Sequence, residues 1–197
     1  MSLIIKICGF RDARQVDAAV AAGADAIGFV FAESIREVST EVANRASANI
    51  PSGVRRIAVM KHPTDNEWQA VLKGYAPDVL QTDAADFASL SVPDAIERWP
   101  VFREGVSVPD AGTTYVYEGK KSGAGQTVDW SAAAPLSAVG NMILAGGLNA
   151  ANVGHAIATA RPYGLDVSSG VESSPGEKDA ELIEAFISAA RAAEKNL

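Results

Sequence analysis

The stretch that decides the fold runs from residue 141 to residue 172, NMILAGGLNAANVGHAIATARPYGLDVSSGVE. Residues 141–145 and 164–167 are short apolar runs that predict buried strands, and the Ala-rich segment 150–160 between them predicts a helix. Strands that alternate with helices in this way are typical of parallel βαβ units. We therefore expect two neighbouring parallel strands, each followed by a glycine-containing loop.

The same alternation extends through the rest of the chain. Further strands are expected at residues 3–8, 26–31, 54–60, 79–82, 100–103 and 114–117. Further helices are expected at residues 11–22, 40–50, 65–75, 130–135 and 179–194, with a weak helical stretch at 87–90 and a turn-like segment at 106–112. Eight strand-plus-connection units favour a closed (βα)8 TIM barrel over an open doubly wound sheet. The barrel would be a trimmed one, since about 250 residues is typical. No linker divides the chain, so residues 1–197 are expected to form a single α/β domain.

The composition limits the cellular compartment and the classes of binding partner that we expect. A formal net charge of −7 argues against a nucleic-acid or anionic-membrane surface, because both require a basic face. Cys8 is the only cysteine, so no intrachain disulfide can form and a reducing compartment is favoured. The N-terminus lacks the basic region of a signal sequence, and no segment reaches the length of about 20 apolar residues that spans a bilayer. A cytoplasmic protein is expected.

Two loops predict a phosphate-binding site. In a barrel the active site lies where strands end, and the last two strands end in Gly146-Gly147 and Ser168-Ser169-Gly170. Glycines let the backbone N–H groups approach an anion, and serine hydroxyls add donors. One such loop alone is more often a tight turn. Two in succession, at the usual phosphate position of this fold, predict a small phosphorylated substrate.

Five segments resemble one enzyme family, phosphoribosylanthranilate isomerase of tryptophan biosynthesis. They are KICGF (6–10), DAIGFVF (25–31), SIREVS (34–39), LAGGLN (144–149) and LDVSSGVESSPGEKD (165–179). They lie at both ends of the chain, so the resemblance covers its whole length. It implies an Amadori rearrangement of N-(5′-phosphoribosyl)anthranilate to 1-(o-carboxyphenylamino)-1-deoxyribulose 5-phosphate. A general acid opens the ribose ring, and a general base removes the proton from C2. The resemblance implies no metal and no organic cofactor, because the imine formed on ring opening already acidifies that C–H bond.

By this resemblance Cys8 is the general base. A lone cysteine in an apolar strand is otherwise an inert core residue. Lys6 lies two positions earlier, so its side chain points to the same face of the strand, where an ammonium favours the thiolate. Lys6 is equally expected to pair with Asp166, and both roles can hold together. The resemblance assigns Asp166 to the positioning of the ribosyl chain.

The resemblance also places Arg36 at the anthranilate carboxylate, which a guanidinium binds with two hydrogen bonds. Without the resemblance, Arg36 would be a solvated loop residue. The family usually has proline and an aromatic residue beside this arginine, whereas this chain has Ile35 and Glu37. Glu37 places a negative charge beside the expected anion site.

The general acid is expected to be Glu118. The family carries an aspartate after the sixth strand, followed by a glycine-rich loop and a DW pair; here Glu118 is followed by GKKSGAGQ (119–126), which is typical of a mobile lid. A surface glutamate that balances the lysines at 120 and 121 is the alternative. Asp83 is a second candidate acid or hydrogen-bonding group, since it stands in Gln81-Thr82-Asp83 where the family has a histidine. Asp129 is expected to cap the helix that begins at Trp130.

The remaining polar residues receive no catalytic assignment. His62 and His155 show no functional pattern, and Gly176, Lys178 and Asp179 are expected to shape the start of the last helix.

Two rival functions stay open. A histidine-pathway isomerase performs the same rearrangement on a bisphosphate, but that family ends strands one and five in aspartate and has two phosphate sites. A bifunctional enzyme is disfavoured for the same reason. The departures at Glu37 and Asp83 and the short loop after Glu118 are also compatible with a degenerate phosphosugar-binding barrel without turnover. A monomer and a homodimer both fit the sequence.

Overall fold

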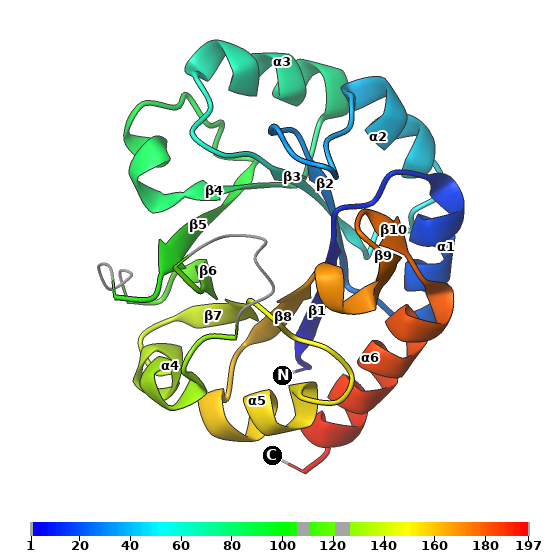
Figure 1. Ribbon diagram of the computed structural model, residues 1–197. Helices are drawn as coiled ribbons and strands as arrows, with labels where there is room; N and C mark the ends of the chain where they lie inside the picture. Colours follow the sequence, from blue (N-terminus) through cyan, green and yellow to red (C-terminus); the bar gives the residue numbers. More distant parts are fainter. Residues whose placement is uncertain (1, 106–110, 121–126, 197) are drawn as a thin grey trace.

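The computed structural model describes residues 2–105, 111–120 and 127–196. Eight parallel strands form a closed barrel in chain order, with helices around the outside (Figure 1). The strands are β1 (Ile4–Cys8), β2 (Ala26–Val30), β3 (Arg55–Val59), β4 (Val79–Asp83), β5 (Glu97–Arg103), β6 (Thr114–Glu118), β7 (Asn141–Ala145) and β8 (Gly164–Val167). The predicted (βα)8 barrel is confirmed.

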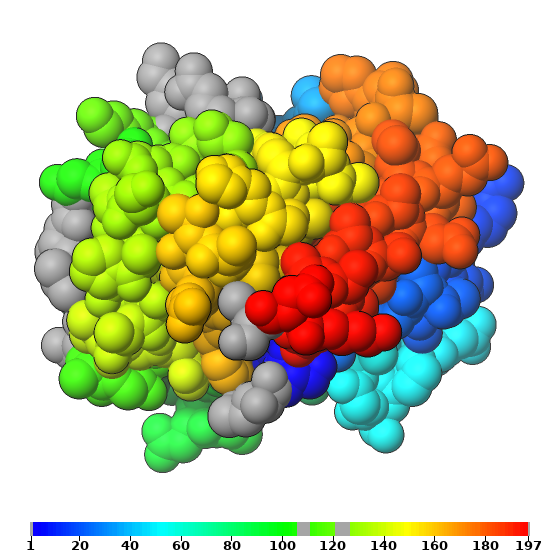
Figure 2. All heavy atoms as spheres, turned by 90° about the horizontal axis from the view of Figure 1, so that it is seen from below, coloured from blue at the N-terminus to red at the C-terminus, as the bar shows by residue number. Residues whose placement is uncertain are grey.

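Six α-helices and two short 3-10 helices connect the described strands. They are α1 (Ala13–Ala22), α2 (Thr40–Ala46), α3 (Asp65–Tyr75), η1 (Ala84–Ala88), α4 (Trp130–Ser137), α5 (Val153–Ala160), η2 (Ser169–Val171) and α6 (Ala180–Glu194). A small antiparallel hairpin, β9 (Glu172–Ser174) and β10 (Glu177–Lys178), lies between η2 and α6. The last helix closes the ring by packing against both α5 and α1 (Figure 2).

Local sequence signals set most of the helix ends. Helix α1 ends at Gly23, which adopts a left-handed conformation with φ 97°. Helix α3 begins with a capping box, in which the Thr64 side chain accepts from the Glu67 N–H and the Glu67 side chain accepts from the Thr64 N–H. Asp129 caps α4 as predicted, and Asp179 caps α6.

Some predicted boundaries were wrong for identifiable reasons. Helix α5 begins at Val153 rather than at residue 150, because the side chains of Asn149 and Asn152 accept from the backbone N–H groups of residues 149, 151 and 152 and form a turn there. Strand β5 begins at Glu97 rather than at residue 100, because it pairs with β4 from Val79 onward. Helix α2 stops at Ala46 instead of residue 50, and the weak helix at 87–90 is the 3-10 helix η1.

The interior of the barrel positions the site. Its middle is filled by apolar side chains from alternate strands, such as Ile57, Trp99 and Ile143, which leaves the carboxyl ends of the strands as the open mouth. The connection from β5 to β6 contains no helix among its described residues, and the turn predicted at 106–112 lies largely outside the described part of the chain. None of the described helices combines the length and the apolar character needed to cross a membrane.

Candidate active site

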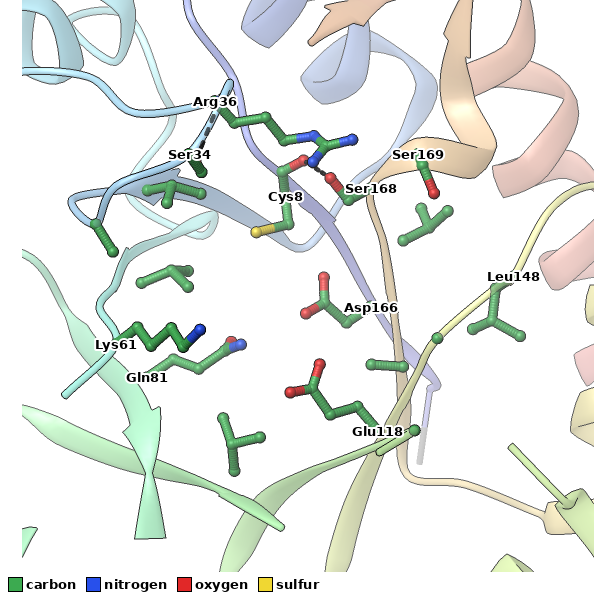
Figure 3. A pocket seen from close by; sticks show the side chains of 18 of the residues that line it. Cys8, Ser34, Arg36, Lys61, Gln81, Glu118, Leu148, Asp166, Ser168 and Ser169 are labelled. Atoms are coloured by element: carbon green, nitrogen blue, oxygen red, sulfur yellow. Dashed lines mark hydrogen bonds between the residues drawn. The ribbon is translucent and has the colours of Figure 1, made fainter. Parts of the chain in front are cut away.

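A cavity of about 270 Å³ opens at the carboxyl ends of the strands. Among its lining residues are ten of the eleven predicted site residues: Cys8, Arg36, Asp83, Glu118, Gly146, Gly147, Asp166, Ser168, Ser169 and Gly170. The eleventh, Lys6, is fully buried beside it. Side chains from β1, β6 and β8 point toward the centre of the cavity, as Figure 3 shows for Cys8, Glu118 and Asp166. Residues that lie more than 100 positions apart in the chain thus share one site.

The Cys8 thiol sits at the end of β1 with only 8% of the residue exposed. Burial raises the pKa of the Cys8 thiol above its ordinary value. Lys6 and Lys178 act in the opposite direction, and the Asp166 carboxylate adds to the rise. Lys6 therefore favours the thiolate as predicted, but burial outweighs its effect on the pKa of Cys8.

Lys6 forms the predicted ion pair with Asp166, at 2.7 Å between Nζ and Oδ2. The two residues are register partners on the adjacent strands β1 and β8. Burial alone would lower the pKa of Lys6, but Asp166 and Cys8 together raise it, so the ammonium stays charged. The other carboxylate oxygen of Asp166, Oδ1, is buried in the cavity wall and accepts no hydrogen bond from the described residues. That oxygen is available to a ligand hydroxyl.

Arg36 is held in place by a carboxylate that the sequence did not single out. Its Nε and Nη2 each donate to Glu172 at 2.7 Å, in a two-pronged pair. Glu172 also accepts from the buried Lys178 Nζ at 2.5 Å and from the Gly176 N–H at 3.1 Å. Despite burial, these partners lower the pKa of Glu172 to about 2. Glu37, by contrast, borders a second hollow together with Arg11 and Glu177, outside the main cavity lining.

Lys178 does more than shape the start of the last helix. Its Nζ donates to the Ser168 carbonyl at 3.1 Å and contacts the Ser168 hydroxyl at 3.2 Å, and that hydroxyl donates to the Cys8 carbonyl at 3.0 Å. Lys178 therefore ties the loop after β8 to the end of β1. Lys178 belongs to the SSPGEKD segment, residues 173–179. The hairpin β9–β10 turns its side chain back toward the barrel, and the sequence alone does not indicate this turn.

The predicted phosphate loops after β7 and β8 pack directly against each other. A Cβ atom added to Gly170 would lie 1.8 Å from the Leu148 carbonyl oxygen, so this contact admits only glycine. Gly9, just after Cys8, has φ +86°, and a Cβ there would lie 2.6 Å from Arg36 Cδ. The two glycines let the phosphate loops and the arginine close around the cavity.

One arginine contacts both candidate acids. Arg103, at the end of β5, donates from Nη1 to Glu118 and from Nη2 to Asp83, the latter at 2.5 Å. No role was predicted for Arg103 from the sequence. The position of Arg103 at a strand end was the available signal for a site residue.

His62 lies close to the site, although its sequence context did not indicate a functional role. Its Nε2 is 3.2 Å from Asp83 Oδ2, and its Nδ1 is 3.1 Å from Asp86 Oδ1. Ligand atoms of His62, Asp83 and Asp86 lie within 4.8 Å of one another, close enough to hold a cation. The hydrogen bonds among the three side chains explain the arrangement without one.

Two glycine-containing loops face a cysteine and a carboxylate at the mouth of a (βα)8 barrel, the arrangement predicted for an enzyme that isomerises a phosphorylated sugar derivative. The sequence matches the family model for N-(5′-phosphoribosyl)anthranilate (PRA) isomerase over residues 5–189. The chain belongs to this family.

Named relatives support this assignment. The N-(5′-phosphoribosyl)anthranilate isomerase of Listeria welshimeri is 40% identical, with 98% of this chain and 100% of the relative covered. The phosphoribosyl anthranilate isomerase of Thermotoga maritima superposes with a TM-score of 0.85 at 28% identity, covering 97% of this chain and 100% of the relative. Monomers derived from that dimeric enzyme give a TM-score of 0.82 at 28% identity, with the same coverage. A phosphoribosyl anthranilate isomerase in complex with reduced 1-(o-carboxyphenylamino)-1-deoxyribulose 5-phosphate gives 0.80 at 29% identity, covering 97% and 100%.

Proposed function

We propose that this protein catalyses the Amadori rearrangement of N-(5′-phosphoribosyl)anthranilate in tryptophan biosynthesis, with Cys8 as general base and Glu118 as general acid. One observation carries the assignment of roles. Cys8 and Glu118 enter the same cavity from β1 and β6, and Figure 3 shows Asp166 lying between them. An acid and a base on opposite sides of a bound sugar are what the two proton transfers require.

The substrate is anchored at both ends. Its phosphate takes the backbone N–H groups of the loops after β7 and β8, with the hydroxyls of Ser168 and Ser169 beside them. Its anthranilate carboxylate lies toward Arg36, whose N–H groups not used by Glu172 face this charge. The related structure in complex with reduced 1-(o-carboxyphenylamino)-1-deoxyribulose 5-phosphate supports a ligand that carries both a phosphate and an aryl carboxylate.

The first step opens the ribose ring. Glu118 gives its proton to the ring oxygen as the bond between C1 and that oxygen breaks. The lone pair of the anthranilate nitrogen forms a C1–N double bond at the same time. The product of this step is an open-chain iminium with a free hydroxyl at C4.

The second step moves a proton from C2 to Cys8. The electrons of the C2–H bond form a C1–C2 double bond, and the iminium nitrogen becomes neutral, which gives an enolamine. The enolamine then loses its C2 hydroxyl proton and gains a proton at C1, which leaves a ketone at C2. The ammonium groups of Lys6 and Lys178 stabilise the Cys8 thiolate that begins this step. Asp166 Oδ1 accepts from a hydroxyl of the ribosyl chain.

The surroundings of the two carboxylates favour Glu118 over Asp83 as the acid. Both contact Arg103. Asp83 also contacts His62 through its second oxygen, which suits it to holding the neighbouring side chains in place. We therefore assign the proton donor of ring opening to Glu118, which enters the cavity from β6.

The cellular setting follows from the reaction. We infer a cytoplasmic enzyme that acts on a small phosphorylated metabolite. Both a monomer and a homodimer are compatible with the proposal, since monomers derived from the dimeric Thermotoga maritima relative share the fold.

A steady-state assay that follows the loss of anthranilate-type fluorescence tests the function. The purified protein should consume the substrate, and Cys8→Ser should reduce kcat by about a thousandfold, the usual range for a lost general base, while the reduced product analogue still binds. Tight binding of the analogue without turnover by the wild type would establish the degenerate barrel instead. Turnover by Cys8→Ser at the wild-type rate would remove Cys8 from the mechanism.

A further inference from the structure

A lysine at the cavity rim has no role in the chemistry above. Lys61 follows β3 and lines the cavity together with Met60 and Gln81. Figure 3 shows its ammonium group pointing into the cavity, toward the Gln81 amide. The side chain comes from the strand next to β2, whose loop carries Arg36.

The ion pairs of the cavity leave Lys61 unused. Among the cations of the lining, Arg36 pairs with Glu172, and Arg103 pairs with Asp83 and Glu118. Lys61 makes no ion pair with any described residue, and this includes Glu33, the acidic group of the neighbouring β2 loop that also lines the cavity. A partly exposed ammonium that points into an anion-binding cavity is a site for a second negative group of the ligand.

The position of Lys61 identifies that group. In the closed barrel β7 lies four strands from β3, directly across the mouth, and β8 lies three strands from β3, so the phosphate loops hold the substrate phosphate on the other side of the cavity from Lys61. The end of the substrate that reaches β2 and β3 is the aryl carboxylate. Arg36 already gives two of its N–H groups to Glu172, which leaves room for a second donor at this carboxylate.

We propose that Lys61 binds the aryl carboxylate of the substrate alongside Arg36 and makes the enzyme selective for anthranilate-derived over aniline-derived substrates. This inference rests on the proposed function for the identity of the substrate. Lys61 is assigned to binding only, because neither of the two proton transfers proposed above uses it.

The test compares two ligands that differ only in the carboxylate. The reduced product analogue and its counterpart made from aniline are titrated calorimetrically into the wild type, Lys61→Met and Lys73→Met. Lys73 on α3 is the matched control, because it is a lysine outside the cavity lining. Lys61→Met should bind the anthranilate-derived analogue about fivefold more weakly, the upper range for a partly exposed ion pair. Binding of the aniline-derived analogue should not change. Lys73→Met should match the wild type with both ligands.

Kinetics supply the second measurement. The KM of Lys61→Met for the natural substrate should rise about fivefold with kcat within twofold, and Lys61→Arg should restore the KM. An equal loss of affinity for both analogues, or no loss for either, would overturn the role of Lys61. Wild-type protein that binds the analogues but turns over no substrate would instead overturn the proposed function, and the comparison of the two ligands would still report on Lys61.

Discussion

At the scale of single residues, the Cys8 thiol shows two opposing influences. Burial at the end of β1 stabilises the neutral thiol, whereas the ammonium groups of Lys6 and Lys178 stabilise the thiolate. The balance lies on the side of the thiol, so Cys8, the proposed general base, is largely protonated at neutral pH. A higher pH converts more of it to the thiolate.

We predict that the Cys8 thiolate forms along a titration curve whose midpoint lies above the ordinary value for a cysteine. The sign follows from the raised pKa, because a higher pKa keeps the thiol protonated to higher pH. Cys8 is the only cysteine of the chain, so the ultraviolet absorbance of the thiolate reports on this residue alone. Cys8→Ser provides the blank. A midpoint at or below the ordinary value would show that the two lysines outweigh burial.

The pairing of Arg103 leads to a second prediction at this scale. Glu118→Gln should lower kcat by about 10²- to 10⁴-fold, because the amide cannot donate the proton that opens the ring. Asp83→Asn should have a smaller effect, since Asp83 holds Arg103 and His62 rather than giving up a proton. The measurement is kcat for both variants on the same substrate. If Asp83→Asn is the slower enzyme, the acid has been assigned to the wrong carboxylate.

At the scale of elements, the proposed phosphate site depends on the contact between the loops after β7 and β8. Gly170→Ala should lower the free energy of unfolding by about 2 to 4 kcal/mol and raise KM, because a methyl group 1.8 Å from the Leu148 carbonyl oxygen must push the loops apart. Urea unfolding and steady-state kinetics measure the two effects.

Gly154→Ala on α5 is the control. Its Cβ would meet only the Ala193 Cβ at 3.8 Å, so this variant should gain about 0.5 to 1 kcal/mol from helix propensity. Equal stability of Gly170→Ala and the wild type would mean that the loops can separate at no cost.

The strands and helices also show how much of the structure the sequence alone predicts. Apolar periodicity and capping residues such as Thr64 and Asp129 are local signals, so the strands and most helix ends were predictable from them. The side chains that complete the site depend on tertiary placement. Lys178 reaches the cavity only because the hairpin β9–β10 turns back, and His62 meets Asp83 only because β3 and β4 are neighbours. Neither contact follows from spacing along the chain.

The net effect of its surroundings on the pKa of Cys8 could not be predicted from the sequence either. The sequence places Lys6 on the same face of β1 as the thiol, which indicates the direction of one influence. The depth of burial that opposes it is a property of the closed barrel. The sequence pattern and the family resemblance therefore predicted which residues meet at the mouth of the barrel. The structure was needed to show how burial and the neighbouring charges together shift the pKa of Cys8.

At the scale of the whole molecule, the proposed catalytic groups and a cluster that stabilises the fold lie at opposite ends of the barrel. Cys8 and Glu118 lie at the carboxyl ends of their strands, in the cavity. At the amino ends, Arg191 of α6 donates to the Leu3 carbonyl at 2.6 Å and to Asp25 at 2.6 Å, and Glu194 accepts from the Leu3 N–H. These contacts join the last helix to the first two strands, which closes the ring of elements far from the site.

This separation predicts that Arg191→Met lowers stability without affecting turnover. The lost hydrogen bonds to a carboxylate and a carbonyl should reduce the free energy of unfolding by about 2 kcal/mol, which corresponds to a fall in Tm of roughly 4 to 8 °C in a chain of this size. At 25 °C, where the variant remains folded, kcat and KM should stay within twofold of the wild type. Arg14→Met on α1 is the matched control, because Arg14 is exposed and pairs with no acidic group among the described residues. Its Tm should not change. A change in kcat or KM for Arg191→Met would show that the amino ends of the strands are coupled to the mouth, because no side chain of this cluster contacts the cavity.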